Sequence, residues 1–481
     1  MFAPRRLLPV AAGLAVAVWA IVALAQDAPL RGRTPRVVGF RDPIAPTARV
    51  TFNRDVAPLL QGRCQKCHHD GGIAPFPLVT YADAYAHKGA MTVSTQNRTM
   101  PPWRVDSACA DFEDDPSLTP AEIATFSDWF DLGAVAGDPR DLPPPLTFDD
   151  GWQLGAPDKV LTMSAPMMPD FSRGDVYRCF VMPTGLTEDR WVDAVEVAPG
   201  VGKMVHHVLL FVDTTGASEA LDAADPGPGY SCFGGPGFTL QNALGGWVPG
   251  SVPSRLPEGI GLRLPKASRV VMQVHYSALS GVTAPDVTSV ALHYATKPIR
   301  QELRILPLIN QSFVIPAGAK DHVVTASVPI VPIPVHVLSI TPHMHLLGRS
   351  MHVSTTMPDG SQKCLVEVPD WSFHWQRQYS FRQPLALPAG SRLDLTAHYD
   401  NSEENPQNVS HPPREVRWGE NTTDEMCIAF LAFTIDGENL LASAGASPMA
   451  KRQKYEPFWE VDWKPVPPPA PFEVPAHWHH H

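Results

Sequence analysis

The sequence predicts a multidomain protein in which a small all-α domain precedes two all-β, jelly-roll-like sandwich domains. Helical periodicity is confined to the residues before about 138. From about residue 158 onwards, short β-branched and apolar runs alternate with Gly/Pro turns, which is typical of sandwiches. This β pattern extends to about residue 445. One small sandwich is too short to hold it, so we expect two, meeting near residue 300.

The composition narrows the classes of function. The chain has 481 residues and a formal net charge of −11, with no basic run inside its body. We therefore expect no binding to nucleic acid. The 52 prolines are about twice the usual share of ~5% and favour short strands and many loops over helical bundles.

The first 25 residues predict a secretory signal peptide. Arg5 and Arg6 precede an apolar stretch, and residues 23–25 (Ala-Leu-Ala) form a small-x-small cleavage site. An uncleaved membrane anchor is the alternative, because the stretch approaches spanning length. In both cases the body is exported, which in a bacterium means the periplasm.

The chain after the signal divides by composition into six parts. These are a tether at 26–47, the helical domain at 48–138, a Pro-rich linker at 139–157, sandwiches at 158–300 and 301–445, and a tail at 446–481. Strands are expected at 191–197, 270–276, 335–340 and 393–399. The terminal His479-His480-His481 is either a native metal-buffering tail or the remnant of a tag.

A short helix is expected directly before Cys64-Gln65-Lys66-Cys67-His68. This C-x-x-C-H pattern is the attachment motif of c-type haem: both thiols bond the haem vinyls, and the histidine becomes an axial ligand. A redox cysteine pair or half a zinc site are the alternatives. The adjacent histidine, the export signal and the lack of a second C-x-x-C argue against both. The sequence therefore predicts a cytochrome c-like domain with one covalent haem.

Met100 is the best candidate for the second axial ligand. It lies in Thr99-Met100-Pro101-Pro102-Trp103, where the prolines stiffen the loop that presents it. It could instead be a core methionine, and Met91 and His87 are weaker candidates.

The helical domain is expected to end with a capped helix. Thr119 is the predicted N-cap, Pro120 the first helical residue and Glu122 the partner in a capping box. The apolar face at i, i+3 and i+7 is expected to consist of Ile123, Phe126 and Phe130.

His343 and His345 form an H-x-H pair after the strand expected at 335–340. On a strand, residues two apart point to the same face. Imidazole suits copper, zinc, iron and nickel, so the pair is a ready half-site for a transition metal. The alternative is two histidines on a half-buried sheet face.

Three further histidines lie on predicted strands. His206 and His207 are in Met204–Val212, and His275 is in Gln273–Tyr276. Adjacent strand residues point to opposite faces, so His206 and His207 share a metal only if that strand end is irregular. Otherwise His207 is a packed core histidine.

Four signatures together resemble the copper type II, ascorbate-dependent monooxygenases, the family that hydroxylates peptidylglycines and dopamine. They are His206-His207, Gln273-Val274-His275-Tyr276, His343-Met344-His345-Leu346-Leu347-Gly348 and Thr422-Thr423-Asp424-Glu425-Met426-Cys427. Their order spans roughly residues 158–445. The front domain resembles bacterial cytochrome c modules, so the whole chain looks like a cytochrome-fused member.

The resemblance implies two copper ions with different roles. The ligands of an electron-storing copper match His206, His207 and His275, and those of an oxygen-binding copper match His343, His345 and Met426. Soft thioether sulfur favours Cu(I), and imidazole accepts both oxidation states. Tyr177 and Gln273 match positions beside the electron-storing copper.

The implied reaction is hydroxylation of a C–H bond of a small organic substrate with O2. The electron-storing copper, with the haem behind it, passes on electrons from a periplasmic donor, either a small reductant or a cytochrome. Peptide-amidating members hold the substrate carboxylate with an Arg and a Tyr where this chain has Thr341 and Phe430, so a less charged substrate is expected. The alternatives are an electron-transfer or copper-handling protein without hydroxylation, and a ligand-binding module with a redox-sensing haem.

Seven cysteines leave five outside the haem motif, enough for two disulfides and one unpaired thiol. The resemblance implies a bond between Cys179 and Cys232. We expect Cys364 and Cys427 as the remaining pair, although Cys364 has no counterpart in the family pattern. The partner of Cys109 stays open.

Overall fold

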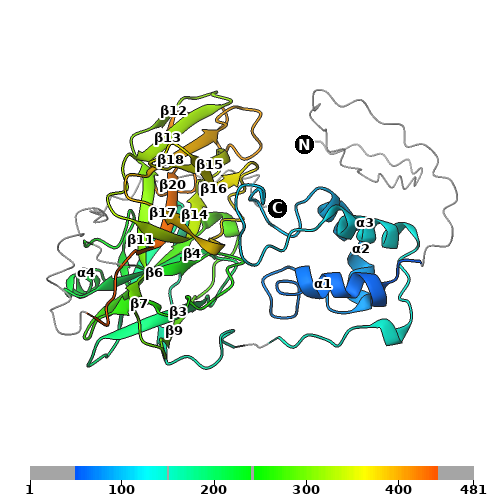
Figure 1. The fold of residues 1–481 in the computed structure, drawn as a ribbon, viewed down its shortest axis with the longest axis horizontal. Coiled ribbons are helices and arrows are strands. Elements are labelled where there is room, and N and C mark those ends of the chain that lie inside the picture. The colour runs from blue at the N-terminus through cyan, green and yellow to red at the C-terminus, as the bar shows by residue number, and fades with distance from the viewer. Residues whose placement is uncertain (1–48, 149–150, 240–242, 443–481) are drawn as a thin grey trace, which may run out of the picture. The chain divides into compact units, whose positions relative to one another are not determined.

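The computed structural model describes residues 49–148, 151–239 and 243–442 (Figure 1). The expected signal peptide, tether and C-terminal tail lie outside these residues. Among the described helices, none has the length and apolar character needed to cross a membrane. The described chain consists mainly of β-sheets with a few helices, as the sequence predicts.

Helices form the first part of the described chain. They are the π-helix η1 (Phe52–Val56), α1 (Ala57–Arg63), α2 (Tyr81–Gln96) and α3 (Pro120–Asp131). The capping box predicted for α3 is confirmed, because Thr119 and Glu122 each accept the other's backbone N–H. We missed α2, although Thr80 and Asp83 form a second capping box at its start.

The apolar face predicted for α3 is partly wrong. Phe126 is buried, but Phe130 is 40% exposed and Trp129 is buried in its place. The two positions lie about 100° apart around the helix. The larger indole takes the inner position because its Nε1–H also finds a buried partner, the Val135 carbonyl, at 3.0 Å.

The first sandwich consists of two five-stranded sheets. In spatial order, one contains β1 (Lys159–Thr162), β9 (Ser289–Tyr294), β3 (Arg190–Ala198), β7 (Ile260–Leu264) and β10 (Gln301–Glu302). The other contains β5 (Tyr230–Ser231), β2 (Val176–Pro183), β8 (Arg269–Tyr276), β4 (Val205–Asp213) and β6 (Ala243–Trp247). Helix α4 (Ala217–Ala224) follows β4, and short 3₁₀ turns span Pro139–Asp141, Phe171–Arg173 and Ala278–Ser280.

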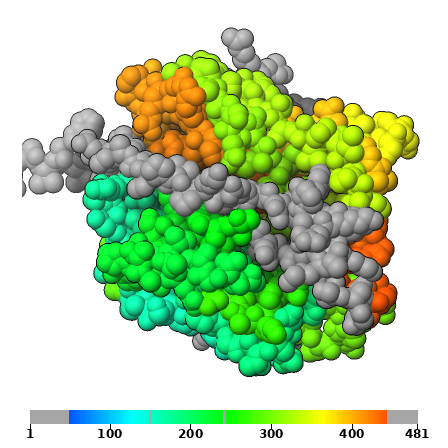
Figure 2. Space-filling view, turned by 90° about the vertical axis from the view of Figure 1, so that its left-hand side faces the viewer, coloured from blue at the N-terminus to red at the C-terminus, as the bar shows by residue number. Residues whose placement is uncertain are grey.

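The second sandwich consists of two four-stranded sheets and a short ribbon. One sheet contains β11 (Arg304–Asn310), β20 (Cys427–Ile435), β14 (Val335–His343) and β17 (Tyr379–Leu387). The other contains β13 (His322–Val328), β18 (Arg392–Tyr399), β15 (Gly348–Thr356) and β16 (Gln362–Val368), and the ribbon pairs β12 (Val314–Ile315) with β19 (Val416–Arg417). Figure 2 shows parts of both sandwiches on one face, the first in green and the second in yellow-green to orange.

The four expected strands are β3, β8, β14 and β18. In β8 every residue from Val270 to Tyr276 is buried. One face of β8 packs in the sandwich core and the other against a separate cluster around the Cys179–Cys232 disulfide, so its run is almost continuously apolar rather than alternating. This position places Gln273 and His275 inside the sheet.

Residues 103–113, which we expected within the helical domain, pack on the second sandwich. Val105 and Phe112 belong to its hydrophobic core. The Glu113 N–H donates to the Ser380 carbonyl at 2.8 Å, and Arg382 donates to the Asp111 carboxylate. The helical core of Phe52, Leu60 and Trp129 is separate from this cluster.

The disulfides are Cys179–Cys232, as the resemblance implies, and Cys109–Cys364. The expected Cys364–Cys427 pair is wrong. Cys364 lies on β16 and Cys427 on β20, which belong to opposite sheets of the sandwich. The 103–113 segment brings Cys109 to Cys364 instead, and Cys427 is a buried free thiol.

Candidate metal centres

His206, His207 and His275 form one compact cluster, in which the ligand atoms lie within 4.8 Å of one another. His207 lies opposite His275 in the pairing of β4 with β8, and the register shifts between Val205 and His207. His206 is therefore the extra residue of a β-bulge. The bulge removes the strict alternation that would send His206 and His207 to opposite faces.

The ring nitrogens of this cluster converge on a common point. The Nδ1 atom of His207 is 3.3 Å from that of His206 and 3.3 Å from that of His275. Burial, together with repulsion by the neighbouring imidazoles, holds the pKa of His206 and of His207 well below the ordinary value. Three imidazoles whose nitrogens face one another fit a transition-metal ion such as copper.

Two residues position His275: Tyr177, which lies on the neighbouring strand β2, and Asp175, which directly precedes β2. The Tyr177 ring stacks on the His275 ring at 4.2 Å between centroids, and its hydroxyl donates to the Glu420 carbonyl at 2.6 Å. The buried Nε2 of His275 lies 3.2 Å from Asp175 Oδ2. Burial alone would raise the pKa of Asp175, but its contacts with His275 and Thr422 hold the pKa below the ordinary value. A carboxylate on the outer nitrogen fixes the ring so that Nδ1 faces the cluster.

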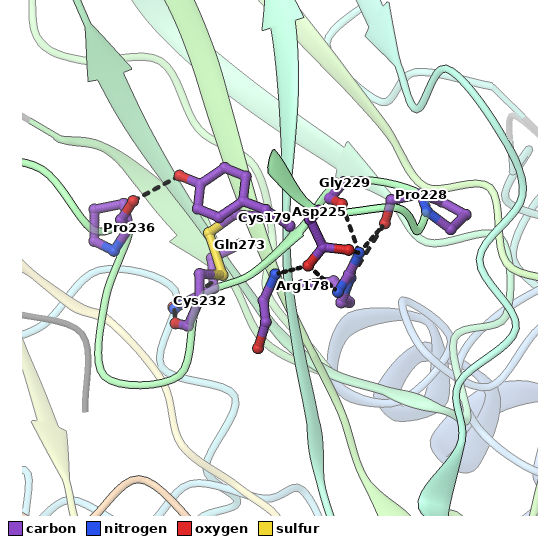
Figure 3. Close-up of a disulfide and its surroundings, with 10 residues drawn as sticks. Arg178, Cys179, Asp225, Pro228, Gly229, Cys232, Pro236 and Gln273 are labelled. Carbon is purple, nitrogen blue, oxygen red and sulfur yellow. Dashed lines mark hydrogen bonds and ion pairs between the residues drawn. A yellow bond between two sulfur atoms is a disulfide. The ribbon is translucent and has the colours of Figure 1, made fainter. Parts of the chain in front are cut away.

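Gln273 lies two residues before His275 on β8, so the two side chains project from the same face of the sheet. The Gln273 Nε2 atom donates to the Cys232 carbonyl at 2.9 Å (Figure 3). In the same region the Arg178 guanidinium donates bidentate hydrogen bonds to the Asp225 carboxylate, at 2.9 and 3.0 Å. Gln273 therefore supports the Cys179–Cys232 disulfide behind the cluster.

The second cluster consists of His343, His345 and Met426. His343 is the last residue of β14, so the expectation that both histidines project from one strand is wrong for His345, which lies two residues beyond. The two rings are nevertheless 5.2 Å apart, at 88° to each other. Met426, directly before β20, brings its sulfur to 3.2 Å from His343 Nε2.

Contacts at Nδ1 fix both rings, and the Nε2 of His343 faces the Met426 sulfur. His343 contacts the Gln376 side-chain oxygen through Nδ1, and His345 contacts the Asp424 carbonyl through Nδ1 at 3.2 Å. Burial lowers the pKa of His343 to about 4 and that of His345 to about 3. Neutral imidazoles that donate through Nδ1 leave Nε2 as the metal-binding atom. Two imidazoles and a thioether suit a copper ion that cycles through Cu(I).

A buried glutamate holds the turn that carries these ligands. The Glu425 carboxylate accepts the backbone N–H of His345 at 2.9 Å and that of Leu347 at 2.6 Å. Because Glu425 directly precedes Met426, the same side chain ties the histidine turn to the methionine.

Phe373 contacts ligands of both clusters. Its ring stacks on that of His206 at 4.5 Å and 15°, and meets that of His345 edge-on at 5.8 Å. His206 belongs to the first sandwich and His345 to the second. The two candidate centres thus face each other across one aromatic side chain.

The haem motif follows α1 and is compatible with covalent attachment. Cys64 and Cys67 are free thiols. His68 bonds through Nδ1 to the Phe76 carbonyl at 3.0 Å, which leaves Nε2 for an iron ion. Met91 is buried in the helical core, while Met100 follows α2 and is half-buried. His87 stacks on Phe76 at 3.8 Å.

Sequence reasoning missed Asp175, Phe373 and Gln376. Asp175 is two residues before Tyr177 and carries no motif of its own. Phe373 and Gln376 lie in the β16–β17 loop, whose aromatic run Trp371-Ser372-Phe373-His374-Trp375 was an unused signal. Aromatic residues gathered in a loop rather than a strand often mark a contact surface.

Comparison with known proteins finds a family model that matches the second sandwich. Residues 304–454 match the model of the C-terminal domain of copper type II ascorbate-dependent monooxygenases. The peptidylglycine alpha-amidating monooxygenase of Rattus norvegicus is 27% identical over 202 residues, 41% of this chain and 20% of that protein. The Mus musculus enzyme is 28% identical over 181 residues, 36% of this chain and 18% of that protein. This chain thus spans about a fifth of the length of these relatives.

Solved structures offer only distant likenesses. The major capsid protein P2 of bacteriophage PM2 has 8% identity and a TM-score of 0.23, covering 58% of this chain and 97% of its own. The VP2 subviral particle of infectious bursal disease virus has 8% identity and a TM-score of 0.18, covering 58% and 72%. We draw nothing from likenesses at these TM-scores.

Proposed function

We propose that this chain is an exported copper-dependent monooxygenase that hydroxylates a C–H bond of a small organic substrate with O2. The observation that carries the proposal is the approach of Met426 Sδ to His343 Nε2, inside the range that matches the family model. The cluster of His206, His207 and His275 would hold a second copper. When bound, the two coppers supply oxygen activation and electron storage.

The residues around each centre have separate tasks in this proposal. At the oxygen-activating site Gln376 holds the His343 imidazole through Nδ1, and Glu425 holds the backbone of His345. Tyr177 and Asp175 hold the His275 imidazole. Burial lowers the pKa of four of these histidines, His206, His207, His343 and His345, so that protons compete little with copper there near neutral pH.

The substrate is expected to lack the carboxylate of a peptidylglycine. Thr341 and Phe430, which stand where amidating enzymes have an Arg and a Tyr, face each other directly in the pairing of β14 with β20. A hydroxyl and a phenyl ring together offer no positive charge and no aromatic hydroxyl for a carboxylate. This pairing favours a neutral or weakly polar substrate.

One covalent c-type haem at Cys64, Cys67 and His68 is proposed as the electron donor to the copper sites. The free thiols and the Nδ1 bond of His68 support this assignment. The two disulfides and the predicted signal peptide support export to an oxidising compartment such as the periplasm.

The test is O2 uptake coupled to product, measured with reduced, copper-loaded protein across candidate C–H substrates. Met426→Ile should abolish uptake while leaving the fold intact, because the exchange roughly conserves volume and costs less than about 1.5 kcal/mol of stability. Met351→Ile, at a buried position of β15, is the matched control and should keep activity. Copper binding without substrate-dependent uptake would point instead to an electron-transfer or copper-handling protein.

A further inference from the structure

The β16–β17 loop, residues 369–378, contacts Trp103 and Arg104, which follow the candidate haem ligand Met100, and it also contacts ligands of both candidate copper sites. Gln376 contacts His343, and Phe373 stacks on His206. Arg377 places its guanidinium 5.3 Å from the centroid of the Trp103 ring. Trp103 is three residues after Met100, and its backbone N–H donates to the Pro101 carbonyl at 2.8 Å.

The segment after Met100, residues 103–113, is fixed to this loop and its flanking strands by several contacts. Arg104 forms an ion pair with Asp370 at 2.6 Å, and Trp103 meets the Tyr379 ring edge-on at 5.1 Å. A few residues later, Cys109 is bonded to Cys364. A domain held only by a Pro-rich linker would sample many positions, whereas these contacts join the segment to the second sandwich at one place.

Gln376, the sequence neighbour of Arg377, contacts His343, a ligand of the candidate copper site, through its side-chain oxygen.

We propose that electrons enter the β half through this loop and reach the site of His343 first, with Trp103, Arg377 and Gln376 as positioning residues. This inference rests on the proposed function. Each transfer moves one electron, so that a ferrous haem becomes ferric and a cupric ion at His343 becomes cuprous. The loop contacts His206 through Phe373, which is three residues further along the chain from Arg377 than Gln376 is. The sequence alone had indicated entry at the three-histidine site.

The test is a single electron transfer without substrate or O2. Protein loaded with haem and Cu(II) is photoreduced at the haem, and haem reoxidation is followed by absorbance. His275→Ala should keep fast reoxidation, and His343→Ala should slow it. Gln376→Leu should slow it by roughly tenfold, as expected when one good hydrogen bond is lost, while Gln376→Glu keeps the acceptor oxygen and should restore most of the rate.

Further measurements separate positioning from misfolding. In Gln376→Leu the haem spectrum, the haem reduction potential and the copper content should match the parent, because Gln376 contacts neither thiol of the haem motif. Gln383→Leu, at an exposed position of β17, is the matched control and should leave the rate unchanged.

Two outcomes overturn different claims. If reoxidation survives in His343→Ala but disappears in His275→Ala, electrons enter at the three-histidine site and the inference is wrong, while the proposed function stands. If the purified chain carries no covalent haem or fewer than two coppers, the haem and metal analyses show this before any kinetics, and the proposed function fails with the inference.

Discussion

His207 lies directly opposite His275 in the pairing of β4 with β8, and their Nδ1 atoms are 3.3 Å apart. The bulge at His206 adds a third nitrogen to the same point. The centre thus depends on two strands held in one register, and each histidine contributes one of three ligand atoms.

His275→Ala is expected to reduce the copper content from two ions per chain to one. Two imidazoles remain, but the ligand set becomes incomplete and loses the ring that Tyr177 and Asp175 hold in place. Elemental analysis and electron paramagnetic resonance of the Cu(II) form check this. His398→Ala, at a surface position paired with Asp321, should leave both ions bound. Retention of two coppers in His275→Ala would contradict the three-histidine site.

Asp225→Asn should destabilise the protein by about 2 kcal/mol at pH 7. The hydrogen bonds from Arg178 lower the pKa of Asp225 to about 2 (Figure 3), below the ordinary value of 3.8. Because the folded-state pKa is the lower one, this contribution is complete above pH 3.8 and disappears as the pH falls through about 2. Urea unfolding should therefore show a difference in the free energy of unfolding between parent and variant at pH 7, and this difference should narrow below pH 3.8.

Asp138→Asn serves as the control for that experiment. Asp138 pairs with Arg140 two residues away on the exposed surface, where solvent screens the interaction. The variant should unfold like the parent at both pH values. If Asp225→Asn and Asp138→Asn lowered the free energy of unfolding equally, the effect would not be specific to the Arg178 contact.

The sequence was sufficient to predict the features that depend on local pattern. The capping box at Thr119 and the apolar run of β8 follow from residue type and spacing. The ligand signatures were also visible, since each of the two histidine pairs is contiguous or nearly so. The sequence predicted that His206 and His207 converge only if their strand end is irregular. A β-bulge depends on the register of the partner strand, which the local pattern does not give.

Features that depend on distant contacts could not be predicted. Five candidate cysteines allow many pairings, and nothing in the pattern joins Cys109 to a residue 255 positions away. Likewise, Val105 and Phe112 look like ordinary apolar residues of a helical domain, yet they pack in the second sandwich. Only the folded chain shows that the β16–β17 loop carries Phe373 and Gln376 to the histidines.

Thiol labelling should find one reactive cysteine, Cys427, in the denatured, unreduced, haem-loaded chain. Cys109 and Cys364 form one disulfide, and the haem occupies both thiols of its motif. In the folded protein Cys427 should resist labelling at pH 8, because burial raises the pKa of its thiol to about 12. Mass spectrometry of the labelled peptides is the measurement. Label on Cys109 in place of Cys427 would restore the Cys364–Cys427 pairing.

Met100→Ala should remove the methionine-to-iron absorption band and lower the haem reduction potential, since a thioether ligand raises the potential. Met100 follows α2, where its N–H bonds the Ser94 carbonyl, and it precedes the loop that carries Trp103. His87→Ala is the matched comparison, because His87 stacks on Phe76, whose carbonyl bonds His68. Visible absorption and redox titration distinguish the two variants. If Met100→Ala leaves the band and the potential unchanged while His87→Ala alters both, the distal ligand is His87 and the haem has two histidine ligands.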